Sequence, residues 1–130
     1  MIFQITPLYA LPLAVLYLAL FMRVSARRGA TGISIGDGGD PLLLQRVRQH
    51  GNCAEWSAFV LILMMLAEGA QVPALWLHAS GALLLVGRIA HPFGLALDNA
   101  AHPLRYVGNG TNIISALIVM AGLARALFAQ

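Results

Sequence analysis

Residues 46–69 read RVRQHGNCAEWSAFVLILMMLAEG, a polar and charged segment that runs without a break into an apolar one. No proline interrupts these residues. At about 1.5 Å of rise per residue, a helix of this length exceeds the roughly 30 Å of hydrocarbon in a bilayer. The stretch therefore predicts a membrane-spanning helix that carries arginine, asparagine and glutamate side chains into its span.

The composition of the whole chain also favours a membrane protein. Its 130 residues are 59% hydrophobic and 10% charged, whereas an ordinary soluble domain is about 25% charged. A soluble domain of this size buries only about 70% of the surface that its unfolded chain exposes, so this much apolar surface needs lipid. Nucleic acid is not expected as a partner, because Arg48 and Arg88 lie near or within apolar runs instead of on one basic face. The one cysteine, Cys53, excludes an intrachain disulfide.

Four apolar stretches are long enough to cross a bilayer. We expect helices at about 5–22, 41–69, 73–97 and 104–128, which make residues 1–130 a single all-α integral membrane domain, a four-transmembrane-helix bundle. The first stretch is expected to be a retained span and not a signal peptide, because it lacks a basic segment at its start. Asp40 followed by Pro41 is a typical helix start, and the glycine-rich residues before it predict a flexible loop.

The arginines predict the orientation of the bundle. Most of them flank the first loop or open the fourth helix on the same side, whereas Arg125 alone lies near the C-terminus. Both termini are therefore expected outside, with the arginine-rich loop in the cytoplasm.

Polar residues recur within the second and third helices. Arg48, Asn52 and Glu55 are spaced i, i+4 and i+7, which places them on one stripe, and Arg88 and His91 also share a face. Counted from Gln71 in the turn, Glu55 lies 16 residues before it and Arg88 lies 17 after it, while Asn52 lies 19 before and His91 20 after. The spacing predicts that Glu55 faces Arg88 and that Asn52 faces His91, each pair at matching depth.

This polar layer has two interpretations. An ion pair between Glu55 and Arg88 could merely join two helices, but polar contacts between membrane helices average only about 0.6 kcal/mol. Five polar groups at one level favour a ligand site instead. Other polar residues are weaker candidates: a metal site from His50, His91 and Cys53 lacks the usual ligand spacing, Glu68 is expected to be solvated at the outer surface, His78 is expected to be satisfied at the interface, and Asn109, Thr111 and Asn112 could line a cavity or permit close helix contact.

The segment from Arg48 to Glu55, RQHGNCAE, resembles the signature of the MAPEG family, the membrane-associated proteins in eicosanoid and glutathione metabolism. Gly87 to His91, GRIAH, resembles that family's third helix, and Pro103-Leu104-Arg105 resembles the entry to its fourth. The similarity extends over nearly the whole chain. The glycine-rich loop followed by Arg-x-His-Gly-Asn looks most like the small bacterial members, which implies a bacterial inner membrane.

The resemblance implies a homotrimer that binds glutathione between neighbouring subunits, near the cytoplasmic side. The residues that match the family's glutathione-binding positions are Arg48, Asn52, Glu55, Arg88 and His91, and the matching position for thiolate stabilisation is Arg105. Where several eicosanoid-forming members have tyrosines, this chain has Trp56 and Leu95. Trp56 can still stack against glutathione and donate a hydrogen bond, whereas Leu95 can do neither, so a specialised eicosanoid enzyme is not expected.

Three functions follow from these expectations. The first is a glutathione-dependent transferase or peroxidase that attacks small hydrophobic electrophiles, delivered from the lipid bilayer, through the thiolate. The second is a non-catalytic trimer that binds glutathione, another thiol or a lipid head group. The third is a transporter or channel subunit that uses the intramembrane charges as an ion path.

Overall fold

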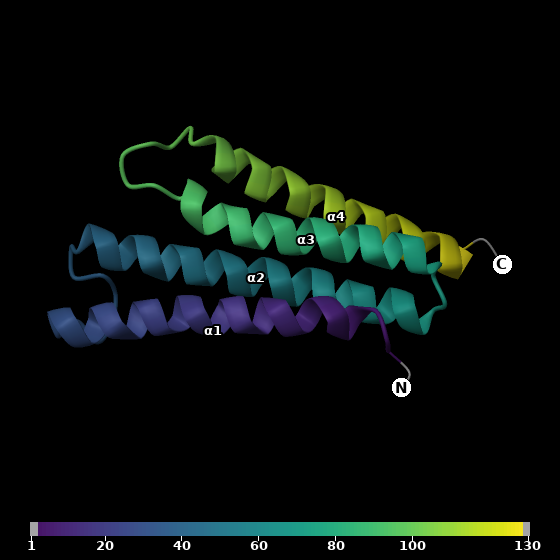
Figure 1. Cartoon of the computed structure of the whole chain (residues 1–130), viewed down its shortest axis with the longest axis horizontal. Helices are drawn as coiled ribbons and strands as arrows, with labels where there is room; N and C mark the ends of the chain where they lie inside the picture. Colours follow the sequence, from purple (N-terminus) through teal and green to yellow (C-terminus); the bar gives the residue numbers. More distant parts are fainter. Residues whose placement is uncertain (1–2, 129–130) are drawn as a thin grey trace.

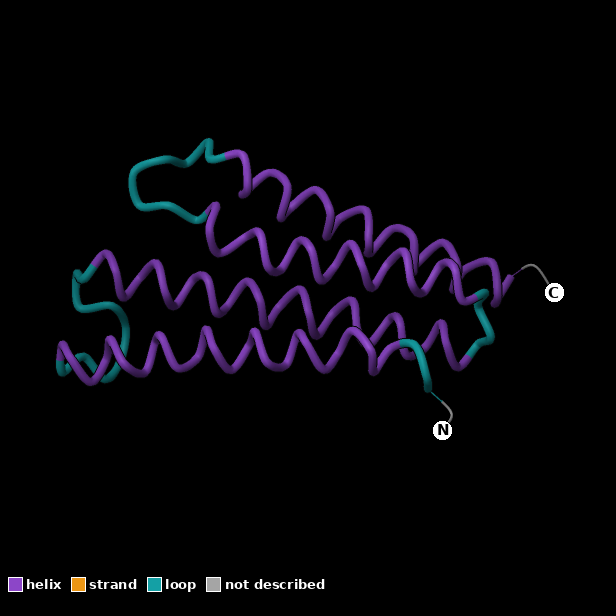
Figure 2. Tube along the Cα trace, viewed as in Figure 1, coloured by secondary structure: helices purple, strands orange, loops and turns teal. Residues whose placement is uncertain are grey.

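The computed structural model describes residues 3–128, and all the regular structure among them is helical. The four helices are α1 (Thr6–Thr31), α2 (Pro41–Gly69), α3 (Ala74–Gly94) and α4 (Pro103–Phe128). They lie side by side along the long axis of the molecule, and successive helices run in opposite directions (Figures 1 and 2). The prediction of four helices in an all-α fold is confirmed.

Two helices end at different places from those predicted. α1 continues nine residues beyond Met22 to Thr31, where Gly32 takes the left-handed conformation (φ 70°) that ends the helix. No proline lies between these residues. The change from apolar to basic side chains shows where the helix leaves the bilayer, and it does not end the helix. α3 ends at Gly94 instead of Leu97, two residues after an internal proline at position 92.

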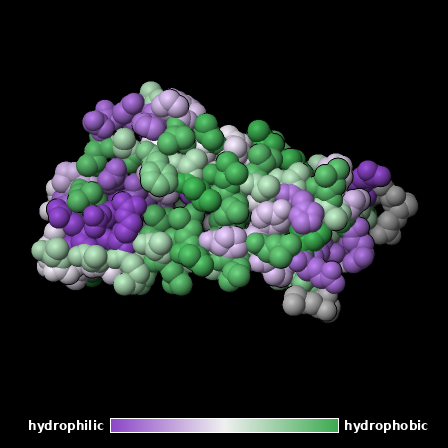
Figure 3. Space-filling model, in the orientation of Figure 1, coloured by the Kyte–Doolittle hydropathy of each residue, from purple (hydrophilic) through white to green (hydrophobic). Residues whose placement is uncertain are grey.

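Three of the four helices are long and apolar enough to cross a membrane: α1, α2 and α4. α3, a 21-residue helix that carries Arg88 and two histidines, is not among them. Length and composition therefore show three of the four expected spans. Figure 3 shows hydrophobic residues gathered over the middle of the molecule, with hydrophilic residues towards both ends. This surface suits a bilayer.

α3 and α4 make the closest helix contact, and small residues at intervals of seven allow it. Ser80 and Ser115 exchange hydrogen bonds, each hydroxyl donating to the other's carbonyl at 3.0 and 2.7 Å. A Cβ atom on Gly87 would lie 2.5 Å from Asn112 Oδ1, closer than real contacts permit. The small residues are Ser80, Gly87 and Gly94 in α3 and Gly108, Ser115 and Gly122 in α4. Such residues let membrane helices approach closely.

Glu68, near the end of α2, caps the start of α1. Its carboxylate accepts hydrogen bonds from the backbone N–H groups of Gln4, Ile5 and Thr6 and from the Thr6 hydroxyl, at 2.6–2.9 Å. The expectation that Glu68 would be solvated was wrong, since its residue is only 8% exposed. Free N–H groups at a helix start attract a carboxylate. This contact could not be predicted from the sequence, because Glu68 lies more than 60 residues from the N–H groups that it binds.

His78, by contrast, has the partner expected of it, because the Tyr9 hydroxyl lies 2.9 Å from its Nδ1. The contact links α1 to α3 on the same half of the bundle as Glu68.

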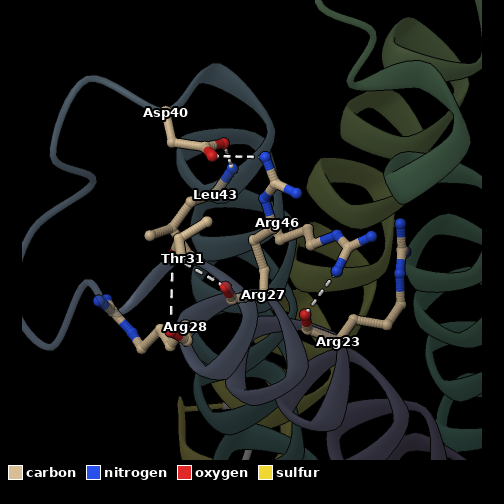
Figure 4. A network of polar contacts seen from close by, with 7 residues as sticks. All are labelled: Arg23, Arg27, Arg28, Thr31, Asp40, Leu43 and Arg46. Carbon is tan, nitrogen blue, oxygen red and sulfur yellow. Dashed lines mark hydrogen bonds and ion pairs between the residues drawn. The ribbon is translucent and has the colours of Figure 1, made fainter.

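Charged side chains hold the α1–α2 loop at its two ends (Figure 4). The Arg27 guanidinium pairs with Asp40, whose carboxylate also accepts from the Leu43 N–H at 2.8 Å as an N-cap. The hydrogen bond from Arg27 and the one from Leu43 lower the pKa of Asp40 below its ordinary value of 3.8. Arg28 donates to the carbonyls of Ile33 and Gly36, both at 3.0 Å. A loop that glycine content predicted to be flexible is therefore tied at several points.

Candidate ligand-binding site

A cleft of about 320 Å³ opens where the start of α2, the end of α3 and the start of α4 meet. It gathers three of the predicted site residues: Arg48 and Asn52 from α2, and Arg105 from α4. The rest of its wall is formed by Leu44, Gln45, Leu95, Ala96 and Leu97. No acidic side chain lines the cleft, so its charge suits an anionic ligand.

Arg88 lies behind this cleft as a buried cation. Its side chain is 1% exposed, and its guanidinium donates to the backbone carbonyls of Asn52 (3.0 Å) and Gly108 (3.3 Å). His91 is equally buried and lies within electrostatic range of both Arg88 and Arg105. The structure thus brings five of the predicted site residues of α2, α3 and α4 into one cationic region: Arg48, Asn52, Arg88, His91 and Arg105.

Glu55 and Trp56 lie outside this region. Glu55 is exposed, and with Trp56 and Phe59 it lines a separate hollow of about 210 Å³ on the outer face of α2. The prediction that Glu55 faces Arg88 was wrong, and they form no ion pair: across residues 3–128 the one salt bridge joins Arg27 to Asp40. Nor does any side-chain hydrogen bond within that range join Asn52 to His91, the other predicted pair.

The reason is the register between α2 and α3. Gln45 Nε2 donates to the Leu95 carbonyl (2.6 Å) and Gln49 Nε2 to the Pro92 carbonyl (2.7 Å), which places Arg88 level with Asn52 and one turn from Glu55. The connection contains Pro73 in an extended conformation (φ −53°, ψ 138°). The observed pairing corresponds to an even count from Ala70, since Asn52 lies 18 residues before it and Arg88 lies 18 after it, whereas the expected pairs were counted from Gln71.

Gln45 and Gln49 were not predicted to contribute to this region. They satisfy carbonyls at the end of α3 that have no N–H donor within their own helix, and Gln49 is only 4% exposed. The available signal was a second polar stripe, Gln45, Gln49 and Asn52 at i, i+4 and i+7, opposite a helix end marked by Pro92 and Gly94.

Several buried polar atoms in this region have no hydrogen-bond partner within the described chain. They are Gln49 Oε1, Arg88 Nε, His91 Nδ1 and both side-chain atoms of Asn112. Buried polar groups normally find partners in protein, water or ligand. The cluster therefore has spare hydrogen-bonding capacity for water or a bound molecule. Two other hollows lie beside the α2–α3 turn at the far end of the bundle, and neither contains a predicted site residue.

Comparison with known proteins agrees with the resemblance in the signature segments. The chain matches the MAPEG family over residues 6–126. It is also similar to inner membrane protein YecN of Escherichia coli K12, at 31% identity over 91 residues that cover 70% of each chain. The same protein from Escherichia coli O6:H1 matches equally well. No solved structure matches the chain significantly.

Proposed function

The chain belongs to the MAPEG family, and from that premise we propose that it is a membrane-bound, glutathione-dependent transferase or peroxidase for hydrophobic electrophiles. The observation that carries this proposal is the cleft in which Arg48, Asn52 and Arg105 converge and whose wall contains no acidic side chain. Glutathione has two carboxylates and an ionisable thiol, so a cationic cleft with an amide in its wall suits it.

Each residue of the cationic region has a separate task. The Arg48 guanidinium offers a carboxylate a forked, charge-assisted hydrogen bond, and the Asn52 amide orients the peptide backbone. Arg88 adds positive potential from behind and also fixes the α2 backbone at Asn52, while the unpartnered His91 Nδ1 can hydrogen-bond a ligand or water. Arg105 stabilises the thiolate, because a nearby cation lowers the pKa of a thiol from about 8.5.

The chemical step is direct attack by sulfur, with no covalent enzyme intermediate. In the transferase reaction the thiolate forms a bond to an electrophilic carbon while the leaving group departs with its electron pair. In the peroxidase reaction it attacks the O–O bond and releases an alcohol, and a second glutathione then converts the sulfenic acid to the disulfide and water. The apolar substrate enters from the bilayer past Leu95 and Leu97 of the cleft wall.

We assign Glu55 and Trp56 to the interface of a homotrimer. Both lie on the outer face of α2, where an exposed carboxylate within an apolar span is costly unless it meets protein. A neighbouring subunit would bring the Glu55 carboxylate to the ammonium group of glutathione and the Trp56 ring beside the peptide. We place the protein in the inner membrane, as YecN is, with the arginine-rich end in the cytoplasm and both termini outside.

The test is glutathione conjugation of a chlorodinitrobenzene by purified wild-type, Arg105→Ala, Arg48→Ala and Arg125→Ala proteins. Arg105→Ala should lower the conjugation rate about a hundredfold, as loss of a charge-stabilising donor does, and should abolish the ultraviolet absorbance of the bound thiolate. Arg48→Ala should weaken glutathione binding about tenfold or more. Arg125→Ala, at the far end of α4, is the matched control and should behave as wild type. Equal rates for wild type and Arg105→Ala would remove Arg105 from the mechanism.

A second candidate is a non-catalytic protein that binds glutathione, another thiol or a lipid head group. The observation that favours it is at Arg105, whose guanidinium donates to the Ala100 carbonyl of the α3–α4 loop (3.3 Å) and is therefore partly engaged. Calorimetric binding of glutathione without thiolate absorbance or conjugation supports this candidate over the enzyme. Failure to bind any thiol would contradict both thiol-dependent functions.

A further inference from the structure

A second cationic site lies away from the cleft, on the α1–α2 pair. The Arg46 guanidinium donates to the Arg23 carbonyl at 2.9 Å, which holds the two arginines together at one depth. Figure 4 shows both guanidinium groups extending to the same side of the two helices. Arg23 is exposed and Arg46 is partly exposed, so an ion outside the protein can reach them.

The neighbouring charges are already used within the protein. Arg27 is paired with Asp40, and Arg28 is held by two loop carbonyls. Neither Arg23 nor Arg46 has a carboxylate partner in residues 3–128, and Arg46 Nε is buried without a hydrogen-bond partner. Two cations are thus kept side by side with no anion between them, which is unfavourable wherever the dielectric constant falls below that of water.

The depth of the pair matches a membrane interface. Exposed apolar side chains of α1 continue up to Phe21 and Met22, and Arg23 is the next residue. Beyond it α1 continues for eight more residues to Thr31, or about 12 Å, so the loop lies farther out in the head-group or water layer. Arg23 and Arg46 therefore lie where the hydrocarbon gives way to lipid phosphates.

We propose that Arg23 and Arg46 form a binding site for the phosphate of an anionic phospholipid such as phosphatidylglycerol. A guanidinium presents a planar fork of donors that fits phosphate oxygens, and two of them can hold one phosphodiester while relieving their mutual repulsion. The site is independent of the cleft and of the proposed function, because it shares no residue with either.

The experiment is native mass spectrometry of protein released from mixed micelles of phosphatidylglycerol and phosphatidylcholine. Wild type should retain phosphatidylglycerol in preference. Arg23→Gln/Arg46→Gln should lower that preference at least about tenfold, from the roughly five- to sixfold that each interfacial arginine contributes. The matched control is Arg28→Gln/Arg125→Gln, which removes the same net charge and should keep the wild-type preference. Circular dichroism of each variant verifies that its helices are intact.

Further variants and competitors make the outcome decisive. Arg23→Lys/Arg46→Lys keeps the charge without the fork, so it should show a preference between those of wild type and the glutamine pair. Equal losses in the two glutamine pairs would show general electrostatics and overturn the site. Displacement of the lipid by inorganic phosphate would show a free-phosphate site, and a changed oligomeric mass in Arg23→Gln/Arg46→Gln would show a subunit contact. Either result also overturns the proposal.

Discussion

At the scale of single residues, Glu68 shows how one carboxylate can organise the end of a membrane bundle. It collects four hydrogen bonds from the first residues of α1, although α1 itself begins without a side-chain cap of its own. A negative charge at a helix N-terminus is stabilising because the free N–H groups there carry partial positive charge. α2 thereby supplies the cap that the sequence of α1 lacks.

Glu68→Gln should therefore destabilise the protein by about 1–2 kcal/mol, the usual value of a lost helix cap. Glutamine keeps one acceptor oxygen but loses the charge and the second acceptor. Denaturant unfolding in detergent measures the change, and amide exchange at Gln4 to Thr6 should accelerate. Asp98→Asn is the matched control, because Asp98 is exposed in the α3–α4 loop and its substitution should alter stability by less than about 0.5 kcal/mol. An equal loss in both variants would contradict the capping role.

The stripe on α2, the partner of Arg88 and the cap by Glu68 show how much of the site could be predicted from sequence. The i, i+4, i+7 spacing correctly identified which face of α2 carries Arg48 and Asn52 to the cleft. It could not give the partner of Arg88, because the counterpart is a backbone carbonyl and every residue has one. The cap formed by Glu68 was equally hidden, because it joins residues more than 60 positions apart.

At the scale of helices, the contact between α3 and α4 positions the site. Gly87 and Gly108 bring the two backbones close enough for the Arg88 guanidinium to reach the Gly108 carbonyl. Helix existence followed readily from apolar length, and the end of α2 was predicted at the correct residue. The α2–α3 register was not predictable from a residue count, because the residue taken as the centre of the turn decides which positions face one another, and the sequence does not mark Ala70 over Gln71 as that centre.

Gly87→Ala should weaken this contact by about 1–3 kcal/mol, the cost of overpacking. The new Cβ would clash with Thr111 Oγ1 and lie 2.9 Å from the Gly108 carbonyl oxygen, and the backbone cannot move without separating the helices. Gly110→Ala provides the control on α4, since a Cβ there meets nothing within 4 Å. It should be neutral or stabilise by up to about 1 kcal/mol through helix propensity. Thermal unfolding in detergent distinguishes the two, and a Gly87→Ala protein as stable as wild type would contradict the packing described.

The start of α2 gives a prediction that depends on pH. The pKa of Asp40 is lowered in the folded protein, so the unfolded chain takes up the proton first as pH falls. The stabilisation by Asp40 is complete above its ordinary pKa of 3.8 and declines as the pH falls below that value. Asp40→Asn keeps an N-cap acceptor but loses the charge that pairs with Arg27. Its deficit in unfolding temperature relative to wild type should be full at pH 6 and should shrink below about pH 4. A deficit that is unchanged with pH would contradict the charge pair.

At the scale of the whole molecule, both described chain ends lie at one end of the bundle, and the α1–α2 and α3–α4 loops lie at the other (Figure 1). This arrangement crosses a bilayer four times only if α3 spans it, although α3 is not among the helices that length and composition alone mark as spans. The most polar side chains of α3 in the interior, Arg88 and His91, are at most 2% exposed. Lipid therefore does not contact them, and burial by α2 and α4 removes most of the cost of a charged residue in a span.

Reporter fusions in a bacterial inner membrane test this arrangement directly. Because arginines mark the cytoplasmic side, alkaline phosphatase joined to the C-terminus should be active and a green fluorescent protein joined there should be dark. Fusions after Gly39 reverse the expectation, since residues 1–39 then carry α1 alone and end in the α1–α2 loop, next to the arginines at the end of α1. If the C-terminal and Gly39 fusions report the same side, α3 does not cross the membrane and its buried arginine needs another explanation. If both reverse together, α3 does cross and Arg125 at the C-terminal end outweighs the loop.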